Sequence, residues 1–284
     1  MIHEVLKIQV PGAAEAGSLY TYFWSPSQEL DYGNQRPVIL LCPGGAYEMT
    51  SDVESEAIAL RFMAMGYHTA VLRYSCGPGI HYPTALLQLA ESVALLRERA
   101  EEWGILGDQI ILQGSSAGGH LAASLAVFWK KDRELAEKLG RSCEEIRPNG
   151  LILSYPVITS GEFAHNGSFR NLLGERYEEL RSKMSLECQV SEDVPPVFLW
   201  HTLSDATVPV ENSLLFLGAL RKAGVSVEFH LFPEGKHGLG LADRQTSKKG
   251  SAEGTLACSV WTELAKKWLD CYFPWYGAGK CSHI

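Results

Sequence analysis

The sequence predicts an α/β protein with a mostly parallel, doubly wound sheet of about eight strands and helices on both faces. Short, continuous apolar runs of the kind that form strands buried on both faces recur along the chain. Between most of them lie segments with the apolar spacing of amphipathic helices. Several apolar runs end in loops that carry Gly, Ser, Asp or His, at the strand ends where such sheets bind ligands.

Composition narrows the class of protein. The 284 residues are 46% hydrophobic and 20% charged, which is ordinary for a globular protein with a large core. Neither an internal repeat nor a Pro/Ser-rich linker divides the chain, so we expect one domain over residues 1–284. The net charge of −8 argues against nucleic acid and against an anionic membrane surface as partners.

The cysteines and the first residues bear on the compartment. The number of cysteines is odd, and no pair has the C-x-x-C spacing of a metal site. The first ten residues lack a basic region followed by an apolar core, and no apolar run has the length of a membrane span. We therefore expect a cytoplasmic protein with reduced thiols. The cysteines are Cys42, Cys76, Cys143, Cys188, Cys258, Cys271 and Cys281.

The first elements are short strands. Extended segments are predicted at residues 5–10 and 19–24, and the second, which alternates and is rich in aromatic residues, is expected at an edge of the sheet. Residues 37–42 form a continuous apolar run that is typical of a central strand. This run ends in Pro43-Gly44-Gly45, which predicts a tight loop at the strand's carboxyl end.

A helix, a strand and a second helix follow. Ser51 and Glu54 match the S-x-x-E capping box, and they predict the start of a helix that Gly66 ends. Residues 69–74 form the next apolar strand. Apolar residues recur at helical spacing over residues 84–103, so one long amphipathic helix is expected there.

The second half of the chain repeats the alternation. Strands are predicted at residues 150–155, 196–201 and 225–232, a helix over residues 210–223, and a final helix that carries Trp261 and Trp268. Residues 158–193 make a longer and more polar connection than is usual. We interpret them as a small insertion over the carboxyl edge of the sheet, with the position of a lid.

Residues 114–118 read Gly-Ser-Ser-Ala-Gly and match the pattern G-x-S-x-G, with Ser116 at its centre. An apolar run precedes the pattern and an Ala/Leu-rich helical segment follows it. This context predicts a sharp strand-to-helix turn with a strained serine at its apex. The flanking glycines leave room for the crossing chain, and the helix N-terminus directs its dipole at the serine. Ser116 is therefore the candidate nucleophile.

Asp205 and His237 complete a candidate triad. Each follows a separate predicted strand, so the carboxyl edge of the sheet brings both close to Ser116. His237 can accept the serine proton, and Asp205 can orient the imidazole. Taken alone, Asp205 could be a turn residue and His237 a surface histidine. For His120 and His201, packing or a backbone hydrogen bond is the simpler interpretation.

A developing oxyanion needs donors that are already in place. The N–H of Ala117, directly after the candidate nucleophile, is one candidate. Gly45 and Ala46, in the loop after the first long strand, offer two more. The sequence contains neither H-E-x-x-H nor a glycine-rich nucleotide motif, so we expect no metal and no cofactor.

Four stretches together resemble a known family. Residues 42–75, 113–126, 201–213 and 232–238 are similar to bacterial α/β-hydrolase esterases, above all to acetyl-esterase and acetylxylan-esterase-like proteins, with hormone-sensitive-lipase and feruloyl-esterase-like groups as neighbours. The chain order of Ser116, Asp205 and His237 is that of α/β-hydrolases. The resemblance implies that these residues are catalytic, and that Gly45, Ala46 and Ala117 lie at the oxyanion hole. Pro43 departs from the family, because many relatives have His there.

The resemblance implies a serine carboxylesterase that removes acetyl or other short acyl groups from saccharides or small esters. The same triad could serve an amide hydrolase of the formamidase or prolyl-oligopeptidase type. A non-enzymatic binder is a third hypothesis, although such proteins usually lack a triad residue. The sequence leaves open the acyl length, the alcohol partner and whether the chain forms a homo-oligomer.

Overall fold

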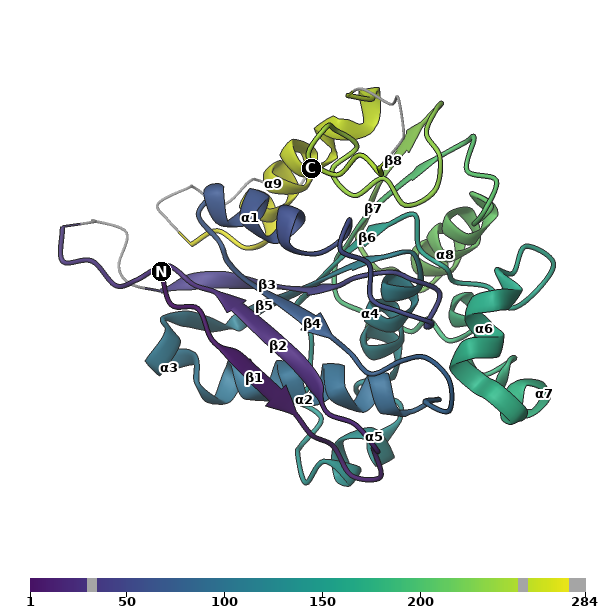
Figure 1. Ribbon diagram of the computed structural model, residues 1–284, viewed down its shortest axis with the longest axis horizontal. Helices are drawn as coiled ribbons and strands as arrows, with labels where there is room; N and C mark the ends of the chain where they lie inside the picture. Colours follow the sequence, from purple (N-terminus) through teal and green to yellow (C-terminus); the bar gives the residue numbers. More distant parts are fainter. Residues whose placement is uncertain (30–34, 250–254, 276–284) are drawn as a thin grey trace.

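One eight-stranded sheet runs through the protein in the order β1-β2-β4-β3-β5-β6-β7-β8 (Figure 1). This computed structural model describes residues 1–29, 35–249 and 255–275. The pairs β1–β2 and β2–β4 are antiparallel, and the remaining pairs are parallel. The predicted α/β class and mostly parallel sheet are therefore confirmed. The strands are β1 (Val5–Ile8), β2 (Gly17–Tyr22), β3 (Arg36–Cys42), β4 (His68–Arg73), β5 (Ile105–Ser115), β6 (Gly150–Ser154), β7 (Val197–Thr202) and β8 (Val227–Phe232).

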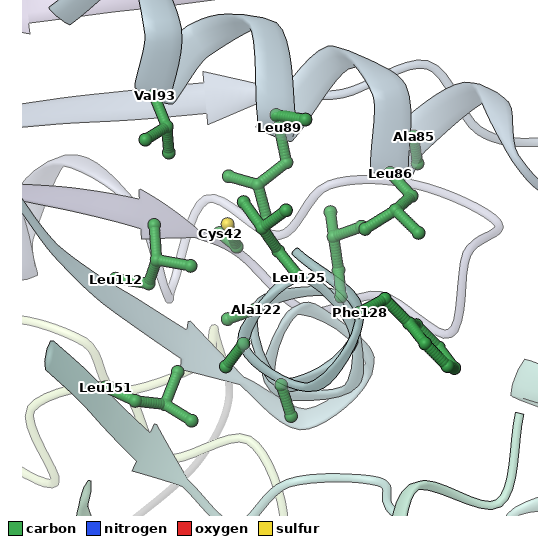
Figure 2. Packing of buried hydrophobic residues seen from close by; sticks show 14 of the residues in the cluster. Cys42, Ala85, Leu86, Leu89, Val93, Leu112, Ala122, Leu125, Phe128 and Leu151 are labelled. Carbon is green, nitrogen blue, oxygen red and sulfur yellow. The ribbon is translucent and has the colours of Figure 1, made fainter. Parts of the chain in front are cut away.

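Helices cover both faces of the sheet (Figure 1). Buried residues of α1 and α9 share one hydrophobic core, and those of α2, α4 and α8 share the other. Figure 2 shows the second core where Leu86 and Leu89 of α2 face Leu125 of α4. The helices are α1 (Glu56–Ala64), α2 (Thr84–Glu98), α3 (Ala100–Trp103), α4 (Ser116–Phe128), α5 (Arg133–Lys138), α6 (Asn166–Leu173), α7 (Tyr177–Leu180), α8 (Glu211–Lys222) and α9 (Trp261–Tyr272).

Strand β3 shows why the central runs are continuously apolar. Val38 and Leu40 pack into the core beneath α2 and α4, whereas Ile39 and Leu41 pack into the core beneath α1 and α9. Because side chains alternate between the faces of a strand, a strand covered on both sides needs apolar residues at every position. All four side chains are fully buried.

Two predicted elements differ from the structure. Strand β2 lies inside the sheet, because β1 pairs with its outer side and takes the edge position. The helix expected over residues 84–103 is divided into α2 and α3 at Arg99, and Gly104, with φ of 65°, ends α3. A break of one residue leaves the apolar spacing nearly unchanged, so periodicity alone does not reveal it.

The predicted capping box is wrong. Helix α1 begins at Glu56, its N-terminal flanking residue is Ser55, and no side chain caps it. The Ser55 hydroxyl donates to the Ser51 carbonyl, and the Glu54 carboxylate accepts a hydrogen bond from the Gly44 N–H at 2.8 Å. Glu54 therefore turns away from the helix and toward the loop that follows β3.

Residues 158–193 contain α6, α7 and two short 3₁₀ turns, Gly174–Arg176 and Leu186–Cys188. Phe169 and Met184 from this segment are buried in the main core. The Asn171 side chain donates to the Ala46 carbonyl at 2.9 Å. The segment therefore lies against the loop that follows β3.

Among the described residues, Cys42, Cys76, Cys143, Cys188 and Cys258 are free thiols. Cys281 lies outside the described residues. None of the helices in the described part of the chain combines the length and the apolar character that crossing a bilayer requires.

Candidate active site

Ser116 stands at the turn between β5 and α4, and its φ of 54° lies in the left-handed region. Non-glycine residues rarely adopt this conformation, and the strain is typical of a nucleophile held at a strand-to-helix turn. The turn requires glycine on both sides of the serine. A Cβ atom at Gly114 would collide with the Gly118 backbone, and one at Gly118 would collide with the Cys42 carbonyl.

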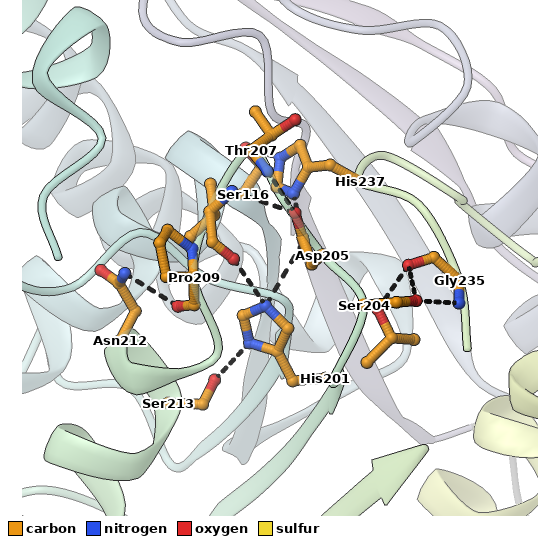
Figure 3. Close-up of polar contacts among 12 residues, drawn as sticks. Ser116, His201, Ser204, Asp205, Thr207, Pro209, Asn212, Ser213, Gly235 and His237 are labelled. Atoms are coloured by element: carbon orange, nitrogen blue, oxygen red, sulfur yellow. Dashed lines mark hydrogen bonds and ion pairs between the residues drawn. The ribbon is translucent and has the colours of Figure 1, made fainter. Parts of the chain in front are cut away.

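The loops after β7 and β8 bring Asp205 and His237 to Ser116 (Figure 3). The distance between His237 Nε2 and Ser116 Oγ is 2.7 Å, and that between His237 Nδ1 and Asp205 Oδ2 is also 2.7 Å. These distances correspond to two consecutive hydrogen bonds. The structure therefore places the three predicted residues in the geometry of a Ser-His-Asp triad.

Asp205 is held ionised by its surroundings. Burial by itself would raise its pKa, but hydrogen bonds from His201 and His237 outweigh burial and hold the pKa well below the ordinary value. The other carboxylate oxygen accepts the N–H groups of Thr207 and Val208 at 2.9 and 3.0 Å. An ionised Asp205 requires the proton on His237 Nδ1, so Nε2 is left to accept the serine proton.

His201 supports Asp205 from the end of β7. Its Nε2 lies 3.1 Å from the Val208 carbonyl and 3.4 Å from Asp205 Oδ2, and its Nδ1 lies 2.7 Å from Ser213 Oγ (Figure 3). Because Nε2 faces two acceptors, it carries the proton, and Nδ1 accepts from the serine hydroxyl. The backbone hydrogen bond expected for His201 is present, and the contact with Asp205 adds to it.

The candidate oxyanion donors come from the loop after β3 and from the first turn of α4. Gly45 and Ala46 line the same cleft as Ser116, and both have positive φ, 126° and 55°. Ala117 is the second residue of α4, so its N–H belongs to the unpaired first turn of that helix. Within the described residues, the N–H groups of Gly45, Ala46 and Ala117 donate to no protein acceptor. They are free to bind a substrate oxygen.

A cleft of about 530 Å³ opens over the serine at the carboxyl ends of the strands. Its wall combines apolar side chains, such as Met49 and Val53, with charged ones, such as Asp52 and Lys248. The cleft is lined by Gly45, Ala46, Met49, Ser51, Asp52, Val53, Glu54, Ser116, His165, Thr207, His237, Gly238 and Lys248.

Hydrogen bonds from buried side chains hold the loop after β3 in place. The Tyr74 hydroxyl donates to the Pro43 carbonyl at 2.7 Å. The Tyr47 hydroxyl lies 2.9 Å from His120 Nδ1, and His120 Nε2 lies 2.9 Å from the Met184 carbonyl. Since Nε2 must donate to that carbonyl, Nδ1 accepts from Tyr47. Burial lowers the pKa of His120 to about 4, so the ring is neutral and links the loop, α4 and the insertion.

Sequence reasoning missed two residues of the cleft. His165, which precedes α6, lines the cleft beside Ser116 and His237. Burial lowers its pKa, and the charge of His237 adds to this effect. Glu54 was interpreted as a helix cap. Neither has a sequence pattern that indicates a site: His165 stands alone in a polar connection, and Glu54 matches a common helix-start motif.

Comparisons with known proteins identify a family and relatives of this chain. A family model described as BD-FAE matches residues 27–220. An endo-1,4-beta-xylanase B from Butyrivibrio fibrisolvens is 39% identical over 217 residues, which are 74% of this chain and 33% of that protein. An acetylxylan esterase from Xylanibacter ruminicola is 30% identical over 206 residues, which are 70% of this chain and 40% of that protein. The chain thus spans well under half of the length of these two relatives.

Solved structures match over nearly the whole chain. An acetyl ester-xyloside bifunctional hydrolase from Caldicellulosiruptor lactoaceticus has a TM-score of 0.80 and 35% identity, with 94% of this chain and 95% of that chain covered. A carboxylesterase from Lactobacillus plantarum has a TM-score of 0.81 and 29% identity, with 95% and 97% covered. Both the sequence relatives and the structural neighbours therefore include enzymes that cleave esters.

Proposed function

The chain belongs to the BD-FAE family of α/β-hydrolase-fold carboxylic ester hydrolases, and we propose that it removes short acyl groups, acetyl above all, from saccharide esters by a serine acyl-enzyme mechanism. The observation that carries this proposal is the pair of 2.7 Å contacts that join Ser116, His237 and Asp205. The family assignment gives the chemical class, and the geometry of the site supports the proposed mechanism.

The first half-reaction transfers the acyl group to the protein. Ser116 Oγ attacks the ester carbonyl carbon while His237 Nε2 takes the hydroxyl proton, and the carbonyl electrons move onto the oxygen. The N–H groups of Gly45, Ala46 and Ala117 stabilise this oxyanion. When the oxyanion collapses, the bond to the alcohol oxygen breaks, and His237 gives its proton to the departing alcohol.

The second half-reaction repeats these steps with water. His237 takes a proton from a water molecule whose oxygen attacks the acyl carbon, and the bond to Ser116 Oγ breaks as the proton returns to the serine. Asp205 keeps the imidazole in one tautomer and stabilises its charged form in both halves. The products are a carboxylic acid and the free alcohol.

Two observations support a short acyl group on a sugar. The wall of the cleft includes Asp52 and Lys248, which offer polar partners to a hydroxylated alcohol. The relatives include a protein named acetylxylan esterase, and the neighbours include an acetyl ester-xyloside hydrolase. A short-chain optimum in a p-nitrophenyl ester series and acetate release from acetylated xylo-oligosaccharides are the expected results.

The direct test replaces the nucleophile. We expect Ser116→Ala to reduce p-nitrophenyl acetate hydrolysis by at least about 10⁴-fold with little change in melting temperature, because triad residues act as a unit. Ser18→Ala, on a strand remote from the cleft, is the matched control and should keep full activity. Unchanged hydrolysis in folded Ser116→Ala would refute the proposal.

The same site chemistry also serves amides, so the substrate panel includes formyl-anilides and dipeptide anilides. A strong preference for these anilides over acetyl esters would replace the esterase proposal by an amide hydrolase. If a fluorophosphonate fails to label Ser116 in the folded protein, the chain is instead a binding protein on this scaffold.

A further inference from the structure

Glu54 is a buried carboxylate at the floor of the cleft. Only 2% of the residue is exposed, and it precedes the first turn of α1 without capping that helix. Its Oε2 accepts the Gly44 N–H at 2.8 Å. Its Oε1 is buried and, among the residues that the structure describes, has no hydrogen-bond partner.

The surroundings of Glu54 are the loops of the site. A Cβ atom at Gly238, next to His237, would lie 3.8 Å from Oε1. Burial raises the pKa of Glu54, and the Tyr155 hydroxyl, the charge of His237, the Gly44 N–H and the charge of Lys248 act in the opposite direction. Burial raises the pKa of Tyr74, and the charge of Glu54 adds to this effect.

A contribution to folding stability does not explain why a glutamate occupies this buried position. A buried carboxylate that lacks partners for one of its oxygens costs folding free energy, and an apolar residue of similar size would avoid that cost. The helix that Glu54 could have capped begins two residues later. A buried and incompletely satisfied charge beside a reactive serine is instead typical of a functional position.

The contact with Glu54 fixes the Pro43–Gly44 peptide, to which the Gly44 N–H belongs, and so the start of the loop after β3. Gly44 lies between Glu54 and the nucleophile: a Cβ atom there would lie 2.5 Å from Glu54 Oε2 and 2.8 Å from Ser116 Cβ. The Gly44 carbonyl accepts the Ser51 N–H at 2.9 Å. In a trans peptide the carbonyl and the following N–H point in opposite directions, so the Gly45 N–H points away from Ser51.

We propose that Glu54 is a positioning residue, which holds the Pro43–Gly44 peptide at the start of the loop so that the Gly45 and Ala46 N–H groups face the Ser116 acyl centre, and whose carboxylate interacts with the charge that His237 gains when it takes the serine proton. This inference rests on the proposed function, because it assigns a role within that mechanism. It also accounts for a glycine at position 44, since the peptide between the carboxylate and the serine has no room for a side chain.

Two substitutions separate the two parts of the role. Glu54→Ala removes both the acceptor and the charge, so kcat for p-nitrophenyl acetate should fall on the order of 10²-fold while KM changes less than about 3-fold. Glu54→Gln keeps an acceptor for Gly44 but removes the charge. It should retain most of kcat, and the acid limb of its pH–rate profile should move to lower pH, because a negative charge beside the catalytic base is lost.

Thermal unfolding shows whether the role is only structural. Because burial raises the pKa of Glu54, its ionised form costs stability at pH values above the folded pKa, and this cost disappears as the pH falls through that value. Glu54→Gln should therefore melt at or above the wild-type temperature at pH 8. Glu56→Gln, an exposed first-turn residue of α1, is the matched control and should change neither kcat nor the pH profile.

The outcomes distinguish this inference from the proposed function. Wild-type protein without esterase activity and without fluorophosphonate labelling of Ser116 would refute both. Two results with an active wild type would refute the positioning role alone. One is a folded Glu54→Ala variant with the kcat of the wild type, and the other is a Glu54→Gln variant with the pH–rate profile of the wild type. If Glu54→Ala does not fold, the positioning role is tested by the Glu54→Gln variant, through its pH–rate profile and its rate of fluorophosphonate labelling.

Discussion

Asp205 is the residue at which burial and hydrogen bonding compete most clearly. It is 6% exposed, yet its pKa lies well below the ordinary value, because hydrogen bonds from His201 and His237 outweigh burial. The depressed pKa has a consequence for stability. The contribution of the ionised carboxylate is fully present above the unfolded pKa of about 3.9, and it is lost as the pH falls through the lower folded value.

We therefore expect Asp205→Asn to lower kcat on the order of 10³- to 10⁴-fold, because the amide no longer enforces the Nδ1–H tautomer of His237. At pH 7 the variant should also lose part of the free energy of unfolding, and the gap to the wild type should close as the pH falls below about 3.9. Kinetics and urea unfolding at several pH values would measure both effects. A gap that widens in acid would contradict this assignment.

Gly118 tests the packing of the nucleophile turn. A Cβ atom there would collide with the Cys42 and Pro43 carbonyls, which are backbone atoms without a rotamer to change. Gly118→Ala should therefore lower the melting temperature by more than about 5 °C and abolish activity. Gly218→Ala in α8 is the control, because nothing lies within 4 Å of its added Cβ, and we expect a stabilisation of about 0.5–1 kcal/mol. Equal melting temperatures for both variants would contradict this account.

At the scale of elements, α6 and α4 hold the loop after β3. Asn171 of α6 donates to the Ala46 carbonyl, and His120 of α4 accepts from the Tyr47 hydroxyl. Both Ala46 and Tyr47 have positive φ, 55° and 57°, which non-glycine residues avoid unless the surroundings hold them. We infer that the segment 158–193 is a wall that keeps the candidate oxyanion donors in place.

Asn171→Ala tests that inference. Without the hydrogen bond to Ala46, the loop should relax from its strained conformation, and kcat should fall by about 10-fold with the fold intact. Asn166→Ala, at the first residue of the same helix, removes a hydrogen bond to Tyr177 and serves as the control. Equal rates for the two variants would show that α6 does not position the loop.

At the scale of the whole molecule, the sheet could be predicted because the central parallel strands β3, β6 and β7 are buried on both faces. That environment favours an apolar residue at every position from Val38 to Cys42 of β3, for example, and the resulting run is visible in the sequence. The meeting of Ser116, Asp205 and His237 followed from the same topology, since parallel strands end at one edge. The edge position of β1 could not be predicted, because its pairing depends on contacts distant in sequence.

The parts of the site that sequence reasoning missed depend on tertiary contacts. Glu54 fits a helix-capping pattern, but its carboxylate finds a backbone N–H ten residues earlier in the chain and a buried place beside the serine. His165 reaches the cleft only because the insertion folds back over the strand ends. Local patterns carry no signal for such contacts, so the three residues of the triad could be predicted and their supporting residues could not.

The central claim is that Ser116 becomes acylated during turnover. Rapid-quench mass spectrometry of the protein mixed with excess p-nitrophenyl acetate tests it most directly. The account predicts one added acetyl group on the peptide that contains Ser116, and no adduct in Ser116→Ala. Rapid acetate release without an adduct on Ser116, together with unchanged hydrolysis by the alanine variant, would contradict it.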